Sequence, residues 1–127
     1  MLMDEASFLE AAESGDFDKI KSFLEDGMDP NAMDEHNRTA LIKASKYGHT
    51  DIVELLIKNG ADINHRDNRG TNALYWASSK GHEEVVQLLI SHHGDVLVYD
   101  DRGWSAKDKA AYHRYSNIVT MLAEAGA

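Results

Sequence analysis

The chain has 127 residues, with 13 basic and 22 acidic side chains, a net charge of −9 and no cysteine. This length predicts a single domain, and the lack of cysteine excludes disulfide bonds and thiolate metal sites. The negative charge argues against a general nucleic-acid-binding protein, because neutralising phosphates needs a basic surface. The N-terminus is acidic and no stretch is apolar enough to span a membrane, so we expect an intracellular protein, cytoplasmic or nuclear, without membrane contact.

Residues 1–33 are predicted to form two short helices, over about 6–13 and 17–25. The second has apolar side chains at helical spacing, which gives it one apolar side: Phe17, Ile20, Phe23 and Leu24. This segment holds nine acidic side chains and only two lysines, whereas the rest of the chain holds 13 acidic and 11 basic side chains. Such polarity is typical of the first unit of a stack, which has one face in water.

Residues 34–66 and 67–99 repeat one pattern with a period of 33 residues. The period relates several sets of identical residues: Asp34, Asp67 and Asp100; Leu41 and Leu74; Ala44, Ala77 and Ala110; Gly48 and Gly81; His49 and His82; Asp62 and Asp95. Within residues 34–66, Thr39 is predicted to cap a first helix, and Thr50 to cap a second helix that Gly60 ends. Two short helices and a loop cannot bury their apolar surface alone, so the period predicts a stacked solenoid.

These motifs resemble ankyrin repeats. The resemblance rests on TALI (39–42) and NALY (72–75) at the helix-one opening, on GH at 48–49 and 81–82, and on IVELLIKNGADIN (52–64) and VVQLLISHHGDVL (85–97) at the close. It covers the chain as one domain of residues 1–127, with units 1–33 (an N-terminal cap), 34–66, 67–99 and 100–127 (a C-terminal cap). It implies an all-α ankyrin-repeat solenoid of helix-turn-helix units with projecting β-turn loops.

Several positions depart from the family pattern. The Pro and His of the family's opening are absent from both central units, so the hydrogen bonds of that His are not expected. His93 and Leu97 replace a glycine and an asparagine of the preceding unit, and we expect the loop into the fourth unit to differ. Lys107 and Arg114 replace a leucine and a glycine, which suits a polar C-terminal cap.

The histidines do not predict a catalytic or metal site. His49 and His82 occupy one repeat position where a helix begins, and we interpret them as structural hydrogen-bonding groups. His92 and His93 are adjacent, do not face one way, and have no third ligand at a suitable spacing. No nucleophile with a base and no glycine-rich phosphate loop is present, so we predict a non-catalytic protein without metal or cofactor.

The resemblance implies a concave groove lined by the loop tips and the exposed side of helix one. Its candidate partner-binding residues are basic or aromatic: Arg38, Lys46, Tyr47, Arg66, Arg69, Trp76, Lys80, Arg102, Trp104 and Tyr112. Arginine and aromatic side chains are enriched at interface hot spots. Trp76 occupies a helix interior and has burial between units as an equal alternative, and Tyr112 has packing against the cap as its alternative. Trp104 follows a turn glycine and is expected to be exposed.

We therefore expect a non-catalytic protein–protein interaction module that binds a partner protein through the groove. An acidic segment with an aromatic anchor would match the groove's composition. The alternative is a structural or assembly subunit that contacts a larger complex through its convex or acidic N-terminal face. RNA or nucleotide binding through the groove is a third hypothesis, which the overall charge opposes. We expect a monomer, and the identity of the partner stays open.

Overall fold

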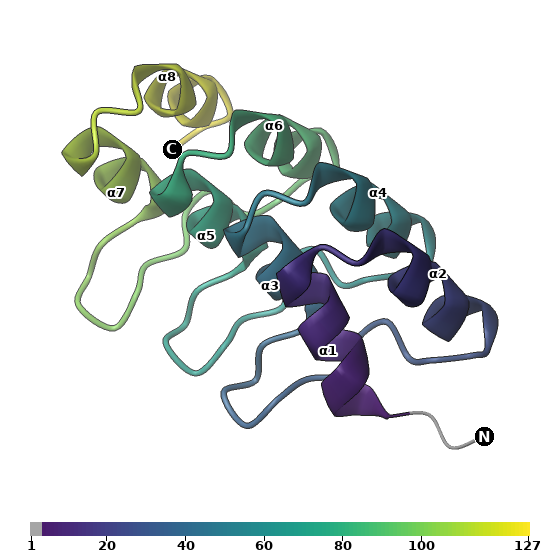
Figure 1. Cartoon of the computed structure of the whole chain (residues 1–127). Coiled ribbons are helices and arrows are strands. Elements are labelled where there is room, and N and C mark those ends of the chain that lie inside the picture. Colours follow the sequence, from purple (N-terminus) through teal and green to yellow (C-terminus); the bar gives the residue numbers. More distant parts are fainter. Residues whose placement is uncertain (1–3) are drawn as a thin grey trace.

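The computed structural model describes residues 4–127, and this part of the chain contains eight α-helices. They pair in chain order: α1 (Glu5–Ser14) with α2 (Phe17–Glu25), α3 (Ala40–Lys46) with α4 (Thr50–Lys58), α5 (Ala73–Lys80) with α6 (Glu83–Ser91), and α7 (Ala106–Tyr112) with α8 (Ser116–Glu124). The odd-numbered helices form one layer and the even-numbered helices a second (Figure 1). The prediction of an all-α solenoid of helix pairs is therefore confirmed. Within residues 4–127, no helix is long and apolar enough to cross a membrane.

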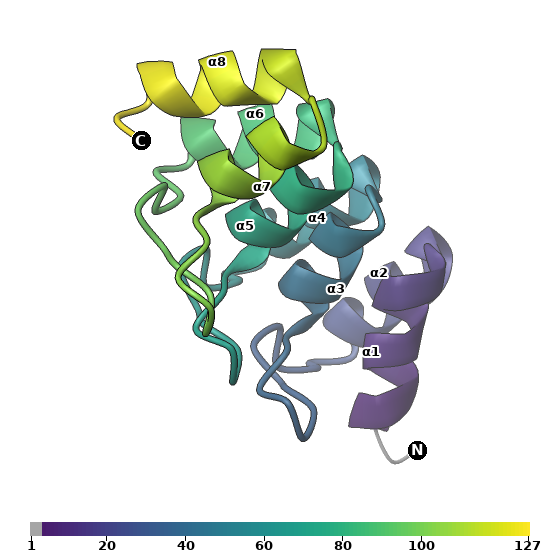
Figure 2. The same ribbon diagram turned by 90° about the vertical axis from the view of Figure 1, so that its left-hand side faces the viewer.

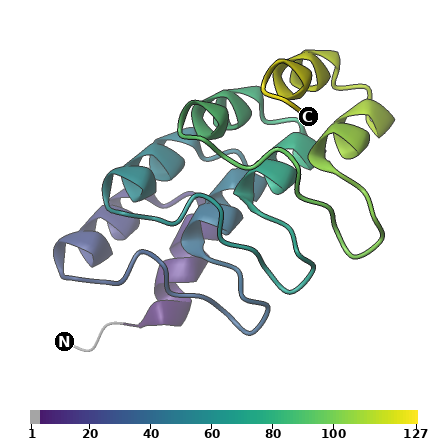
Figure 3. The ribbon, with the colours of Figure 1, turned by 180° about the vertical axis from the view of Figure 1, so that it is seen from behind.

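Three long loops connect the helix pairs and project from one side of the stack (Figure 3). Each contains a short antiparallel turn, which we call hairpin 1 (residues 33–39), hairpin 2 (66–72) and hairpin 3 (99–105). In hairpin 2 the Asp67 N–H donates to the Thr71 carbonyl at 2.9 Å, and in hairpin 3 the Asp100 N–H donates to the Trp104 carbonyl at 2.8 Å. Viewed from the side, the hairpins lie next to the odd-numbered helices, and the first and last helices, α1 and α8, lie at opposite ends of the stack (Figure 2).

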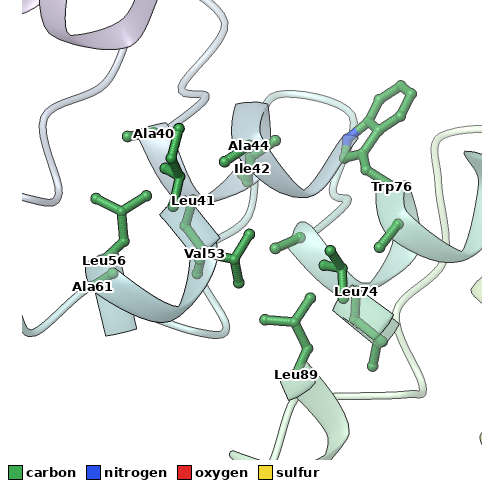
Figure 4. Close-up of a cluster of buried hydrophobic side chains, with 14 of the residues drawn as sticks. Ala40, Leu41, Ile42, Ala44, Val53, Leu56, Ala61, Leu74, Trp76 and Leu89 are labelled. Atoms are coloured by element: carbon green, nitrogen blue, oxygen red, sulfur yellow. The ribbon is translucent and has the colours of Figure 1, made fainter. Parts of the chain in front are cut away.

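The apolar core runs between successive helix pairs (Figure 4). Six side chains were predicted to be buried there, and all six have an exposed fraction of 1% or less: Leu41, Ala44, Leu56, Leu74, Ala77 and Leu89. Leucine at the same position of successive units fills the space that the neighbouring pair leaves open, which is how short helices obtain a continuous core. The prediction of which helix faces are buried is confirmed.

The two predicted caps of the second helix pair have different outcomes. The Thr39 hydroxyl accepts a hydrogen bond from the Ile42 N–H at 3.3 Å and caps α3, as predicted. The prediction for Thr50 is wrong, because α4 already begins at Thr50 and the residue at its cap is His49, which makes no side-chain cap bond. The turn between α3 and α4 is so short that Thr50 falls inside the helix, and His49 takes the preceding non-helical position.

The histidine of each Gly-His pair joins one helix pair to the one before it. His82 Nε2 lies 2.9 Å from the Lys46 carbonyl oxygen, and His49 Nε2 lies 2.9 Å from that of Glu13. Gly48 makes room for this contact, since a Cβ atom there would lie 2.5 Å from His82 Nδ1, and its φ of +75° disfavours other residues. The structural interpretation of His49 and His82 is therefore confirmed.

The loop before the fourth pair was predicted to differ from the preceding loop, and for the backbone this prediction is wrong. His93 adopts a φ of 66°, so it takes the left-handed conformation that Gly60 takes one unit earlier. The next N–H then donates to the helix in the same way, from Gly94 to the Leu89 carbonyl at 2.8 Å. Arg114 also adopts a positive φ, of 62°, at a glycine position. Local hydrogen bonding and packing thus impose the repeat's backbone even without glycine, at a small conformational cost.

The change at Leu97 does alter a side-chain contact. Asn31 Oδ1 accepts a hydrogen bond from the Asp62 N–H, and Asn64 Oδ1 accepts one from the Asp95 N–H, each at 2.7 Å. These bonds tie each loop to the equivalent loop of the next pair. Asn31 and Asn64 also donate through Nδ2 to the Gly60 and His93 carbonyls, 29 residues further on. Leu97 holds the third such position, is 57% exposed and has no side-chain hydrogen-bonding group, so it cannot make the equivalent bond to the Gly126 carbonyl at the junction of the third and fourth pairs.

Candidate partner-binding surface

The second residue of each hairpin is an aspartate whose carboxylate holds the turn closed. Asp67 Oδ1 accepts hydrogen bonds from the Thr71 N–H at 3.0 Å and the Thr71 hydroxyl at 2.7 Å. Asp100 Oδ1 accepts one from the Trp104 N–H at 2.9 Å, and Asp34 forms the equivalent bond in hairpin 1. The carboxylates of Asp67 and Asp100 are buried, so they fix the hairpins from within.

The second carboxylate oxygen of Asp34 and of Asp67 faces the first helix of the same unit, and that of Asp100 faces the first helix of the preceding unit. Asp67 Oδ2 accepts a hydrogen bond from Trp76 Nε1 at 3.1 Å, and Asp100 Oδ2 accepts one from the Tyr75 hydroxyl at 2.6 Å. Asp34 Oδ2 instead pairs with Lys43 Nζ at 2.9 Å. The sequence pattern used these three aspartates only to define the 33-residue period and predicted no hydrogen bonds for them. Their signal was the tendency of Asp to start a turn, since each Oδ1 accepts the N–H two residues further on.

The protonation of these groups follows from burial and hydrogen bonding. Burial alone would raise the pKa of Asp67, but hydrogen bonds from Thr71, Trp76 and Arg38 to the carboxylate outweigh it and hold that pKa below its ordinary value. The pKa of Asp100 is lowered in the same way, against its burial, by bonds that include the Tyr75 hydroxyl. Burial and the Asp100 carboxylate raise the pKa of Tyr75, so its hydroxyl stays a donor.

Trp76 is buried, with 7% of its surface exposed, so of its two alternatives the structure shows the packed one. Its ring extends away from Leu74 and Leu89 (Figure 4). Three cations lie against the ring, at centroid distances of 4.9 Å for Lys46 Nζ, 5.1 Å for Arg38 Cζ and 5.6 Å for Arg69 Cζ. Trp76 therefore forms a floor beneath basic side chains rather than an exposed contact.

The candidate arginines are not all brought together. Arg38 Nε pairs with Asp67 at 3.2 Å, and Arg69 pairs with Asp100 at 3.6 Å, so buried carboxylates partly neutralise both. Arg66 is not part of this cluster, because it pairs with Asp95 in the loop after α6, at 3.4 Å. The expectation that Arg66 shares one face with Arg69 is not supported. Its side chain leaves hairpin 2 toward the loop of the next pair.

Trp104 and Tyr112 line a hollow of about 460 Å³ between hairpins 2 and 3 and α7. We call it the aromatic hollow; its lining residues are Arg69, Asp100, Asp101, Arg102, Trp104, Lys109 and Tyr112. The two aromatic rings meet edge to face, with centroids 5.7 Å apart, and Lys109 Nζ lies 5.3 Å from the Trp104 ring. Trp104 is 38% exposed, as predicted, and Tyr112 is 69% exposed, so it is not packed into the cap. Lys109 was not among the predicted site residues, although it lies one period after Trp76.

Lys46, Tyr47 and Lys80 lie near the ends of α3 and α5. Lys46 Nζ sits 5.4 Å from the Tyr47 ring as well as above Trp76, and Tyr47 is 44% exposed. Burial, together with the charges of Arg38 and Lys80, lowers the pKa of Lys46. Among the ion pairs of residues 4–127, none contains Lys46 or Lys80. Over the same part of the chain, no group of three or more His, Asp or Glu side chains could hold a metal ion.

Comparison with protein-family models places the whole arrangement in a known class. The model described as ankyrin repeats (3 copies) matches residues 8–100 and 65–127, which together span nearly the entire chain. A comparison with curated proteins finds no match. Ankyrin repeats are generally protein–protein interaction modules and are typically non-catalytic. The helix pairs, the projecting hairpins and this match agree, and the chain belongs to the ankyrin repeat family.

Proposed function

We propose that residues 1–127 act as one domain that binds an extended acidic segment of a partner protein, with an aromatic side chain of that segment seated in the aromatic hollow. The observation that carries this proposal is the exposure of Trp104 on hairpin 3, whose turn the buried Asp100 carboxylate holds closed. A large aromatic side chain held rigidly at the surface binds at low entropic cost, which is the character of an interface hot spot.

The charges around the hollow favour an acidic partner. Lys109 lies over the Trp104 ring and Arg102 also lines the hollow, whereas Asp100 and Asp101 are engaged by Arg69. Residues 1–33, with nine acidic side chains and two lysines, make the other end of the stack strongly negative. This asymmetry would orient an acidic segment toward hairpin 3 during association.

The distribution of exposed apolar side chains favours this surface over assembly through the even-numbered helices, which form the layer away from the hairpins (Figure 2). Large apolar side chains that are exposed lie on hairpins, on loops or on odd-numbered helices and their ends: Met33, Tyr47, Leu97, Tyr99, Trp104 and Tyr112. Within residues 4–127, none lies on α2, α4, α6 or α8. A stable contact through the even-numbered helices would need an apolar centre, so the convex alternative has less support.

Selection of peptides from a random display library against the immobilised protein tests the proposal. We expect enriched peptides to combine an aromatic residue with Asp or Glu. Trp104→Ala is expected to speed dissociation of such a peptide roughly 30-fold, as for a hot spot worth about 2 kcal/mol. Arg102→Glu is expected to slow association and flatten its salt dependence. Arg69 is unsuitable for this purpose because it pairs with the buried Asp100.

Leu97→Ala is the matched control, since Leu97 is an exposed apolar residue on a loop and does not line the hollow. Its peptide dissociation rate should equal that of the unmodified protein. Equal dissociation rates for Trp104→Ala and Leu97→Ala would refute the proposed role of the aromatic hollow.

A further inference from the structure

We infer that Lys46 and Arg38 form a second binding site, specific for an oxyanion, on the floor made by Trp76. The inference rests on the proposed function, because the oxyanion would be a carboxylate or phosphate group of the same partner segment whose aromatic residue enters the hollow. It assigns a location to the acidic part of that segment, which the aromatic hollow alone does not give.

Lys46 lacks the carboxylate partner that its basic neighbours have. Lys43 pairs with Asp34 at 2.9 Å, Arg38 with Asp67 at 3.2 Å and Arg69 with Asp101 at 3.4 Å. In residues 4–127, no carboxylate oxygen lies within 4.0 Å of Lys46 Nζ. Its contacts are aromatic faces, which stabilise a cation less than a carboxylate does.

The surroundings of Lys46 favour an anion beside it. Lys46 is half-buried, and this burial and the charges of Arg38, Lys80 and Lys43 disfavour its protonated form, whereas the exposed Glu13 acts in the opposite direction. A partly desolvated cation among other cations is costly unless an anion joins it. An oxyanion beside Lys46 would reverse this cost and at the same time attract Lys80, so binding and charge compensation would favour the same position.

The site is held in place by contacts within the protein. Asp67 Oδ2 accepts hydrogen bonds from both Trp76 Nε1 and Arg38 Nε, which fixes the floor and one of the cations with a single buried carboxylate. Because only Nε of Arg38 is used in that bond, its terminal N–H groups remain for an oxyanion. A preformed cation cluster binds an anion without the entropic cost of ordering its side chains.

The position of the site also predicts the spacing within the partner. Lys46 ends α3, Arg38 lies in hairpin 1 just before α3, and Trp76 belongs to α5, whereas the aromatic hollow adjoins α7. Successive packed helices lie about 8–10 Å apart. One or two such steps correspond to about three to six residues of extended chain at about 3.3 Å per residue. Selected peptides should therefore carry an acidic residue about three to six positions from the aromatic residue.

Trp76 fluorescence gives a direct test that needs no partner. Trp104→Phe leaves Trp76 as the single tryptophan, beneath Lys46. Inorganic phosphate and acetate are titrated separately into this variant, with chloride keeping the ionic strength constant. We expect a saturable change in Trp76 fluorescence. Adding Lys46→Gln should raise the Kd about tenfold, as for the loss of one charge-assisted hydrogen bond, and Lys46→Arg should restore most of the affinity.

Lys58→Gln is the control, since Lys58 is exposed on α4 and pairs with Glu54 on the same helix. It should leave the Kd unchanged. Tighter binding of phosphate than of acetate would identify a phosphorylated residue as the ligand, and equal binding would identify Asp or Glu. No saturable change, or the same Kd with and without Lys46→Gln, would overturn the oxyanion site. That result would leave the proposed binding of an aromatic, acidic segment unaffected. Saturable phosphate binding together with a failed peptide selection would instead support the oxyanion site and contradict the proposed function.

Discussion

The Tyr75 hydroxyl donates a hydrogen bond of 2.6 Å to the Asp100 carboxylate, and both side chains are buried at the junction of the third and fourth helix pairs. The same carboxylate accepts the Trp104 N–H at 2.9 Å. One buried group therefore both ties α5 to hairpin 3 and sets the position of the exposed Trp104 ring. The stability of the stack and the shape of the aromatic hollow depend on the same contact.

Removing the hydroxyl should therefore destabilise the protein. Tyr75→Phe leaves Asp100 Oδ2 buried with only Arg69 near it, and the free energy of unfolding is expected to fall by about 1–3 kcal/mol, the cost of an unsatisfied buried polar group. Denaturant unfolding measures this change. Tyr112→Phe removes an exposed hydroxyl and should change stability by less than about 0.5 kcal/mol. Equal effects in the two variants would contradict the account of the Tyr75–Asp100 bond.

The lowered pKa values of Asp67 and Asp100 predict a loss of stability in acid. Each has a folded pKa below its unfolded value, so between these two values the unfolded chain binds more protons and stability falls as pH falls. Their contribution should be complete above about pH 5 and decline as the pH drops through about 4, the ordinary Asp range. Asp100→Asn should flatten this decline, while Asp101→Asn, at an exposed side chain, should not. An unchanged decline in Asp100→Asn would show that this carboxylate is not the source.

Core leucines should contribute strongly and similarly in successive pairs. Leu56→Ala or Leu89→Ala is expected to lower the free energy of unfolding by about 2–5 kcal/mol, because each side chain is fully buried and its removal leaves a cavity. Leu97→Ala, at an exposed position, should have an effect below about 0.5 kcal/mol. Unfolding midpoints of Leu56→Ala and Leu89→Ala close to that of Leu97→Ala would show that the buried faces are assigned wrongly.

Stability should be uneven along the stack. The fourth pair lacks the asparagine tie at Leu97, carries Arg114 at positive φ, and has Tyr115 where His49 and His82 bond to the preceding pair. An end unit with few neighbour contacts opens most easily. Amide hydrogen exchange is therefore expected to be fastest in residues 100–127. Equal protection of residues 34–66 and 100–127 would contradict this expectation.

The repetitive part of the fold could be predicted from sequence because period and apolar spacing are one-dimensional signals. The predicted helix over 17–25 coincides with α2, and the Thr39 cap is present as predicted. Both depend on residues within one turn of each other, where local rules apply. The error at Thr50 came from the same rules. Thr50 is a residue type that can cap a helix, but it follows a turn whose length the sequence does not fix, and His49 takes the cap position instead.

The candidate surface was harder to predict, because its chemistry depends on pairs about one period apart. Arg38 and Asp67 pair across 29 residues, and so do Arg66 and Asp95, yet only the former pair lies against Trp76. A list of basic residues treats all of these arginines as free. The structure instead distinguishes a compensated arginine from the uncompensated Lys46, and it shows Trp76 beneath the cations rather than beside them.

Hydrogen–deuterium exchange of the protein, with and without a selected acidic aromatic peptide, tests the central claim most directly. If the partner binds the hairpin side of the stack, the peptide should slow exchange in hairpin 3 and α7, residues 99–112, and leave α2, α4, α6 and α8 unchanged. Protection confined to the even-numbered helices or to residues 4–33, with residues 99–112 unaffected, would contradict it and would favour an assembly contact through the convex or N-terminal face.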